Sequence, residues 1–427
     1  MKQGPLVNNP TMSSPLRPAS ALRAPGFLTF VVTNMLAMMA DNIEHVISYW
    51  VCFEKFHSAA LAGFAVVSHW LPFLLFSVAV GALNDRYDSR RIVQVGMALF
   101  ILVSLGWGYC FVTDSLTMEI AMVLLVLHGC AGVLWSTSNQ MLLYAIAGPA
   151  HLQSAVRLNA TFRYLGMLVG PAVGSGIMHW LGPSGGIFLN TVFYLPVVVW
   201  LISAPYGPRF LSATAAPRRA VRGLADILST AKEVRGLPIV LAMTLLAGCA
   251  SFFVGNSYQA QMPGFAHDLG QAKADVTYSI LLSADAAGAL LAGFLLERRT
   301  GTLKTRPSTA LKLAAGWGLA LAVFAFVDSY PLAIVCLFTA GFFELSFSSM
   351  AQALVQLNAP NESRGRVLGL YSMSAFGLRT FSGFTVGLVG SVTSIHVSLA
   401  CSGLTFVAIA TTLYLRLKRA ASGATAG

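Results

Sequence analysis

Residues 81–91 read GALNDRYDSRR, a short charged segment between two long apolar stretches. Its charged side chains are Asp85, Arg86, Asp88, Arg90 and Arg91. The segment is too short to cross a bilayer, so we expect a tight turn at a membrane surface. The pattern recurs 212 positions later, with Gly293, Leu295, Glu297 and Arg298 standing where Gly81, Leu83, Asp85 and Arg86 stand here. The two parts of the chain therefore look like copies of one unit.

The composition is that of an integral membrane protein. Hydrophobic residues make up 56% of the 427 residues, charged residues only 10%, and the mean hydropathy is +0.71. These values lie outside the range of soluble domains. The net charge is +11, but the basic residues lie in short segments between apolar spans, so we expect no nucleic-acid partner. The six cysteines are scattered without metal-binding spacing, so we expect neither disulfides nor a metal site.

Apolar stretches of about 18–25 residues, the length that crosses a bilayer, recur twelve times. Their expected ranges are 27–50, 59–83, 92–112, 117–146, 155–181, 186–204, 237–260, 275–297, 309–327, 331–357, 366–389 and 392–416. Gly148 and Pro149 are expected to break the longest apolar tract into two antiparallel helices. The predicted fold class is therefore all-α integral membrane, with twelve transmembrane helices in two pseudo-symmetric six-helix bundles.

The Lys and Arg residues predict the orientation of these spans. With the N-terminus in the cytoplasm, 23 of the 27 Lys and Arg residues fall on cytoplasmic segments, where positive charge is retained. We therefore expect both termini in the cytoplasm. The predicted organisation is a disordered tail over 1–25, an N-terminal bundle over 26–204, a cytoplasmic linker over 205–236, a C-terminal bundle over 237–416 and a tail over 417–427.

Charged side chains within apolar spans cost a few kcal/mol each and are therefore candidates for function. Asp41, Glu44 and His45 lie on one polar stripe of the first span, together with Asn34 and Ser48. Two carboxylates one turn apart in an apolar site cannot comfortably both be charged, so they are candidates for proton coupling. The alternative is structural, with Asp41 bonded to a neighbouring helix and Glu44 and His45 near the outer headgroups.

In the second half, Asp285, Glu344 and Arg379 are expected at one level near the membrane midplane. A buried Arg379 needs a counter-charge, so we expect it to pair with Asp285 or Glu344, either for function or only for stability. The remaining polar candidates for a central cavity are Asn256 and Arg163. The isolated histidines His69 and His128 are interpreted as core residues, and the candidate aromatic walls are Trp70, Trp135 and Tyr258.

The fifth span carries Gly166, Gly170, Pro171 and Gly174. Glycines at four-residue spacing allow a neighbouring helix to approach closely, and the proline bends the helix. We expect this face to seal the two halves together on one side of the membrane.

Residues 81–91 resemble the signature loop of the major facilitator superfamily, a Gly-x-Leu-x-Asp-Arg pattern followed by basic residues. Residues 166–174, GMLVGPAVG, look like the antiporter motif of the same superfamily, which marks exporters. Arg-Tyr-Asp of the loop and residues 360–366, PNESRGR, are similar to the bacterial branch that contains the enterobactin exporter and related siderophore exporters. Asp88 stands where many members have Gly, so we expect a turn there that tolerates the left-handed conformation.

The resemblance implies that helices 1, 4, 7 and 10 line a central cavity. It also implies that Asp85 contacts the start of helix 11, and that Arg86 and Arg90 bind acidic partners across the interface between the halves. We predict a proton-coupled exporter of a small organic molecule, such as a siderophore or a drug, that works by alternating access in a bacterial inner membrane. Its expected partners are the substrate, protons and the lipid bilayer; it is expected to be a monomer and to use the proton gradient without a cofactor.

Three alternatives stay open. An importer, a facilitator or a lipid flippase of the same fold would move its substrate differently, and fold alone does not decide direction. A transport-dead receptor would tolerate replacement of Asp41 and Asp85. An intramembrane enzyme is the least favoured alternative, because the sequence carries no catalytic motif for one, and we expect the protein not to be an enzyme.

Overall fold

The computed structural model describes residues 20–204, 223–255, 258, 261–269, 274–298, 305–382 and 389–423, and the regular structure in these ranges is all helical. In the first half lie η1 (Ala21–Arg23), α1 (Phe27–Phe56), α2 (Ala59–Arg86), α3 (Ser89–Val112) and α4 (Met118–Ser203). The remaining elements are α5 (Leu224–Arg235), α6 (Pro238–Cys249), the π-helix η2 (Ala250–Val254), α8 (Met262–Asp268), α9 (Ala274–Arg298), α10 (Pro307–Phe324), α11 (Tyr330–Asn358), α12 (Arg364–Ala375), η3 (Gly377–Phe381), α13 (Val389–Val392) and α14 (Ile395–Gly423).

The long helix α4 makes three passes along α1, because its backbone leaves the helical conformation twice. Gly148 has φ 64° and ψ 172°, and Gly182 has φ 69° and ψ 174°; both values are open to glycine but not to most residues, and a proline follows each glycine. Trp135 hydrogen bonds to Asn34, which lies near the start of α1. After the first break, Gly174 packs against Ile43, and after the second, Trp200 returns to Phe30. The predicted break at Gly148-Pro149 is therefore confirmed.

With α4 counted as three, the described helices make the twelve predicted passes. The other nine are α1, α2, α3, α6 with η2, α9, α10, α11, α12 with η3, and α14. Among the described residues, seven helices are long and apolar enough to cross a membrane, with α4 counted once. The helix α1 is not among these seven, and it is the helix that carries Asp41, Glu44 and His45.

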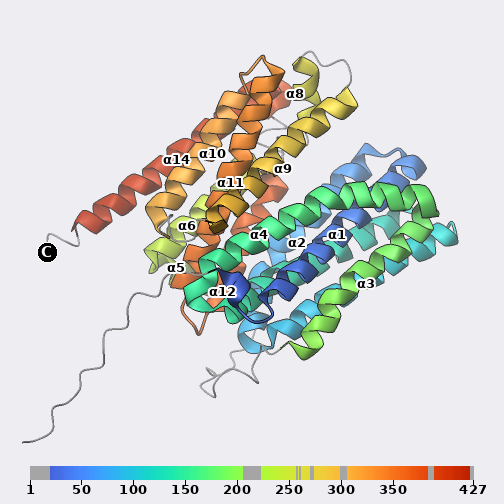
Figure 1. Cartoon of the computed structure of the whole chain (residues 1–427), viewed down its shortest axis with the longest axis horizontal. Helices are drawn as coiled ribbons and strands as arrows, with labels where there is room; N and C mark the ends of the chain where they lie inside the picture. The colour runs from blue at the N-terminus through green and yellow to red at the C-terminus, as the bar shows by residue number, and fades with distance from the viewer. Residues whose placement is uncertain are drawn as a thin grey trace, which may run out of the picture.

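The helices form two bundles, which Figure 1 shows side by side, α1 to α4 in blue to green and α6 to α14 in yellow to red. Each bundle has its own apolar core. The large core of the second bundle is built from residues between Val234 and Ala410, with Val78 as its one buried member from the first. The cores of the first bundle draw on α1, α2, α3 and α4, with Ala353 as the one buried member from the second bundle. Smaller apolar clusters also join the two bundles.

Two equivalent joints hold the bundles together at the end of the molecule that carries residues 81–91. The carboxylate of Asp85 accepts hydrogen bonds from the backbone N–H groups of Gly365 (2.6 Å) and Arg366 (3.2 Å) at the start of α12. Glu297, 212 positions after Asp85, accepts hydrogen bonds from Ser154 (2.7 Å) and Arg157 (2.7 Å). As the resemblance implies, Asp85 lies where the helix dipole favours a negative charge. The internal repeat thus places one carboxylate at each joint.

The basic residues of the loop differ from the expectation. Among the described residues, the Arg90 guanidinium contacts Asp88 of its own loop (2.7 Å) and the Ala204 carbonyl (2.6 Å), both in the first bundle. Arg86 lies against the ring of Tyr87 and forms no ion pair among the described residues. Asp88 is not left-handed: its φ is −66°, and its side chain accepts a hydrogen bond from the N–H of Arg90 (3.0 Å). Asp fits here because it caps α3. Arg91 donates to Gln94 (2.8 Å).

The glycine face of the fifth span also packs differently from the expectation. A methyl group on Gly166 would lie 2.7 Å from the carbonyl oxygen of Met35, and one on Gly170 would lie 2.7 Å from Cβ of Asn42. Both neighbours belong to α1 of the same bundle. Gly174, one turn further on, lies against Ile43, and Pro171 is exposed. The predicted close approach is present, but it joins two helices within a bundle and does not seal the two bundles together.

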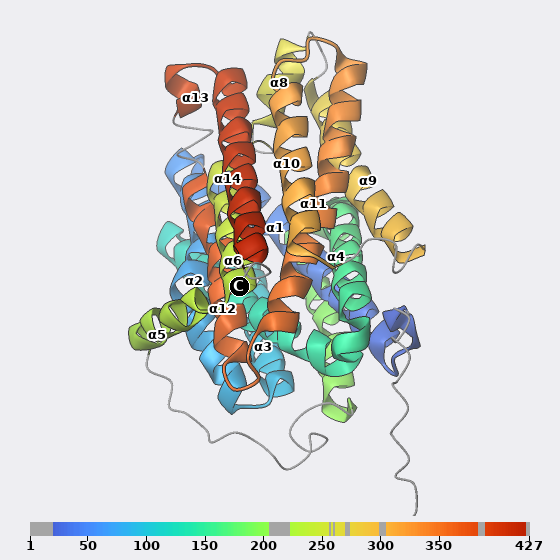
Figure 2. The same ribbon diagram turned by 90° about the vertical axis from the view of Figure 1, so that its left-hand side faces the viewer.

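The helix α5 lies within the predicted linker, beside α2 and α12 and at an angle to the long helices (Figure 2). It bears an amphipathic pattern, as the sequence indicates, and Glu233 accepts a hydrogen bond from Ser363 just before α12. The linker is thereby tied to the Asp85 joint. Residues 1–19, 205–222 and 424–427, which belong to the predicted tails and linker, lie outside the described residues.

Candidate functional site

A cavity of about 360 Å³ lies between the two bundles near the middle of the long helices. As the resemblance implies, it is lined by the first, fourth, seventh and tenth passes, which are α1, the first part of α4, α6 with η2, and α11. Residues of α2, the second part of α4, α10, α12 and η3 complete the wall. The charged and imidazole side chains of the lining are Asp41, His45, His69, Arg163, Glu344 and Arg379.

On the N-terminal side of the cavity, His128 of α4 bridges the two carboxylates of α1. Its Nε2 lies 2.9 Å from Oδ1 of Asp41, and its Nδ1 lies 2.8 Å from Oε1 of Glu44. Glu44 also accepts a hydrogen bond from Ser104 of α3. Glu44 is 1% exposed, His128 3% and Asp41 8%, so the group is nearly closed off, and Asp41 is its member on the cavity wall. We call Asp41, His128 and Glu44 the proton triad.

The chemistry of the proton triad follows from how many protons it holds. An imidazole donates hydrogen bonds from both nitrogens only when it carries a positive charge; a neutral ring donates from one. Two carboxylates and one imidazolium leave one net negative charge, and one further proton makes the group neutral. A buried group that alternates between these states is suited to exchanging protons with the cavity.

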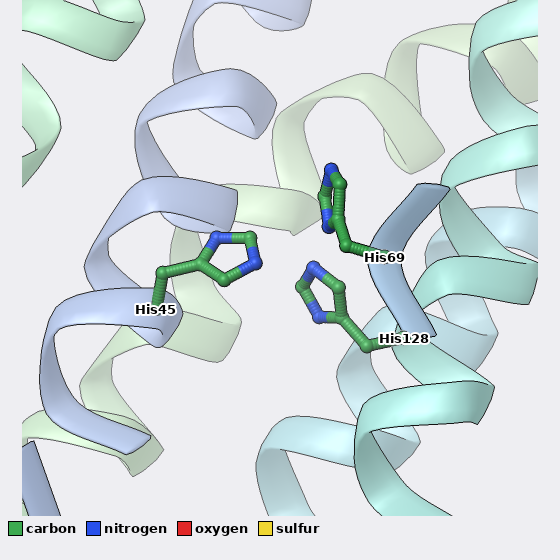
Figure 3. A group of neighbouring side chains, drawn as sticks. All are labelled: His45, His69 and His128. Carbon is green, nitrogen blue, oxygen red and sulfur yellow. The ribbon is translucent and has the colours of Figure 1, made fainter. Parts of the chain in front are cut away.

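His45 and His69 extend this cluster towards the cavity. Figure 3 shows the rings of His45, His69 and His128 pointing toward one another from α1, α2 and α4. One ring nitrogen of each histidine lies within 4.8 Å of those of the other two, and Nδ1 of His45 is 3.8 Å from Asp41. Histidines this close could hold a metal ion. Both nitrogens of His128, however, already face carboxylates at hydrogen-bond distance.

The C-terminal side of the cavity carries the predicted midplane charges, but not the predicted ion pair. Arg379 forms no ion pair with Asp285 or Glu344 in the part of the chain that the structure describes. Its guanidinium carbon lies 4.9 Å from the centre of the Trp70 ring. Asp285 points to Tyr258, whose hydroxyl donates to it (3.0 Å), and is not on the cavity wall. Glu344 is on the wall with Tyr164 and Arg379 as polar neighbours. Stacking on aromatic rings thus takes the place of the expected pairing.

The remaining candidates are distributed as follows. Arg163 lines the cavity, and so do the predicted aromatic walls Trp70 and Trp135. Asn256 lies outside the described residues.

Sequence reasoning missed two members of the site, His128 and Ser104. Each lies alone on its own span, so only the packing of α3 and α4 against α1 shows that it reaches Glu44. A signal was present, because His128 stands at the midplane level of its span, where an unpaired histidine is costly.

Comparisons with known proteins agree with this architecture. A model of the Major Facilitator Superfamily matches residues 26–383. The chain is 25% identical to the multidrug efflux pump Tap of Mycobacterium tuberculosis over 401 residues, covering 90% of this chain and 92% of Tap. It is 21% identical to the staphyloferrin A transporter of Staphylococcus aureus over 408 residues, covering 92% and 98% of the two chains.

A crystal structure of the E. coli fucose:proton symporter FucP superimposes with a TM-score of 0.72 at 12% identity, covering 91% of this chain and 98% of FucP. A second structure of FucP, in the outward conformation, also has a TM-score of 0.72 and covers 92% of this chain.

Proposed function

This chain belongs to the major facilitator superfamily of membrane transporters, and on that basis we propose that it is a proton-coupled exporter of a small organic molecule. Its relatives include a multidrug efflux pump and a siderophore transporter, which supports a small organic substrate. The single observation that carries the proton coupling is the triad of Asp41, His128 and Glu44. It is buried in one bundle and reaches the cavity through Asp41.

The two joints support alternating access with the substrate site between the bundles. Asp85 and Glu297 bind the starts of α12 and of the second pass of α4, so the end carrying residues 81–91 is closed. The distribution of Lys and Arg makes this the cytoplasmic end, with both termini in the cytoplasm of a bacterial cell. The structure then corresponds to a state closed to the cytoplasm, and transport proceeds when both joints open.

The proposed mechanism begins with the binding of a proton and ends with the entry of a new substrate. A proton from outside reaches Asp41 through the cavity and neutralises the triad. Protonation of Asp41 removes an acceptor for the hydrogen-bond donors of the substrate, so bound substrate leaves outward as the proton binds. The joints then open, the proton leaves to the cytoplasm and a new substrate enters. Protons and substrate therefore compete for one cavity, which is the thermodynamic requirement of antiport.

The test is accumulation in everted bacterial membrane vesicles with an imposed pH gradient. A panel of catecholate, hydroxamate and carboxylate siderophores and cationic dyes is offered to vesicles with and without the protein. We expect accumulation of at least one compound that an uncoupler abolishes. Accumulation that persists with the uncoupler would contradict proton coupling, and gradient-driven loss from preloaded vesicles would identify an importer.

A further inference from the structure

We propose that the central cavity binds the acidic group of an organic anion between Arg163 and Arg379. The inference rests on the proposed function, since it names the class of substrate that the same cavity takes. The two arginines come from opposite bundles, Arg163 from α4 and Arg379 from η3, and both line the cavity. A ligand held by both would therefore touch the two parts that move during transport.

Arg379 forms no ion pair in the described part of the chain, although Glu344 is its neighbour on the cavity wall. Its guanidinium carbon lies 4.9 Å from the ring centre of Trp70 and 5.5 Å from that of Phe376. Its Nε is buried without a hydrogen-bond partner. A desolvated guanidinium with an unused donor costs free energy that an anionic ligand would recover.

Arg163 faces the same aromatic ring from the other bundle. Its guanidinium carbon is 6.0 Å from the ring centre of Phe376 and 6.0 Å from that of Trp135. Like Arg379, it forms no ion pair among the described residues. The two like charges repel each other across Phe376, and an anion between them would remove that repulsion.

Among the described residues, neither carboxylate of the cavity wall forms an ion pair with these arginines. Oδ1 of Asp41 lies 2.9 Å from Nε2 of His128. Glu344 lies on the wall without forming an ion pair with either guanidinium. Guanidinium groups bind carboxylates and phosphates with two parallel hydrogen bonds, which an ammonium cannot match. Trp70, Trp135 and Phe376 add flat apolar surface beside them, so the favoured ligand combines an acidic group with a planar or apolar body.

The experiment measures binding of three probes of similar shape and different charge to the full-length protein in lipid nanodiscs. Naphthoate is an anion, naphthamide is neutral and naphthylmethylamine is a cation. By isothermal titration calorimetry we expect naphthoate to bind at least about tenfold more tightly than naphthamide, the ratio that one charge-assisted hydrogen bond supplies, and naphthylmethylamine to bind most weakly.

Variants assign the preference to the two residues. Arg163→Gln and Arg379→Gln are each expected to weaken naphthoate binding about tenfold and to leave naphthamide binding unchanged. Arg379→Lys keeps the charge and is expected to keep part of the preference. The matched control is Arg306→Gln, an exposed arginine at the start of α10, which is expected to bind as the wild type does.

The wild-type measurement decides the proposal even if a variant fails to fold. The proposal would be overturned if naphthamide or naphthylmethylamine bound as tightly as naphthoate, or if naphthoate did not bind at all. An Arg379→Gln protein with unchanged selectivity would also overturn it. Because binding needs no gradient, selective naphthoate binding without uphill transport contradicts only the proposed function. Uphill transport restricted to neutral or cationic compounds contradicts only the anion site.

Discussion

Among single residues, His128 has the largest expected effect on both stability and transport. It separates two buried carboxylates that lie on the same helix, and its removal leaves them facing each other in an apolar surrounding. Breaking a buried charged group in this way typically costs about 3–5 kcal/mol.

We therefore predict that His128→Ala lowers the thermal unfolding midpoint by several degrees and abolishes gradient-driven transport. The midpoint is measured by tryptophan fluorescence of the purified protein in detergent. His179→Ala is the matched control, because His179 is exposed on the same helix α4. Equal midpoints for the two variants would show that His128 does not hold the carboxylates together.

At this scale the sequence predicted half of the site. Asp41, Glu44 and His45 could be found because they are charged residues on one face of an apolar helix, and helical periodicity defines that face. His128 could not be assigned to them, because periodicity does not give the rotation of α4 relative to α1. The pairing of Arg379 was predicted wrongly for a related reason: charge balance requires a partner, but aromatic rings can also stabilise a cation.

Among the helices, the approach of α1 to the second pass of α4 depends on small residues. A methyl group on Gly166 would meet the Met35 carbonyl oxygen at 2.7 Å, whereas one on Gly176 of the same helix would meet nothing within 4 Å. These two glycines therefore make a matched pair.

We predict that Gly166→Ala destabilises the protein by about 1–3 kcal/mol, because the backbone of α1 must shift to admit the methyl group. Gly176→Ala is expected to be neutral or slightly stabilising, since alanine favours the helix. Thermal midpoints of the two variants, measured side by side, check the prediction. A Gly176→Ala protein as unstable as Gly166→Ala would show that the contact with α1 does not explain the effect.

Each of the two joints consists of a carboxylate that lies against the start of a helix. Replacing Asp85 by Asn removes the charge and weakens two hydrogen bonds to α12 at a cost of about 1.5–3 kcal/mol, so the closed end should open more often.

We predict that Asp85→Asn and Glu297→Gln each raise the alkylation rate of a cysteine introduced at Ser372 by about tenfold or more, measured on a variant without the native cysteines. Ser372 is buried at the closed end, where it accepts a hydrogen bond from Gln140 of the other bundle. The control is Asp114→Asn at the opposite end, where a hydrogen bond from Lys55 (2.5 Å) lowers the pKa of an exposed carboxyl. An effect of the control equal to that of Asp85→Asn would contradict the assignment of the joint.

The helices themselves were predictable, and their contacts only in part. Apolar length defined twelve spans, and Gly148-Pro149 defined the first turn within α4. The 212-residue offset between Asp85 and Glu297 indicated an internal repeat, but the joint of Glu297 with Ser154 and Arg157 became evident only from the packing of α4 against α9. The glycine face of the fifth span was recognised, but its neighbour α1 was not. The spacing of glycines indicates that some helix approaches closely and does not identify which one.

In the whole molecule, the two bundles contribute different side chains to the central cavity. The first bundle carries the proton triad, the second contributes Arg379 and Glu344, and we propose that protons and substrate compete in the cavity between them. Each bundle has its own apolar core, so the two can move as bodies while the joints at one end open and close.

Proton coupling through Asp41 is tested most directly by gradient-driven accumulation by Asp41→Asn in everted vesicles, with energy-independent exchange of the same compound as the internal control. The compound is one that the wild type accumulates. We expect Asp41→Asn to lose uphill accumulation, because the triad no longer exchanges its proton with the cavity, and to retain exchange, because the cavity and the joints are intact. Uphill accumulation at the wild-type level in Asp41→Asn would contradict proton coupling through Asp41.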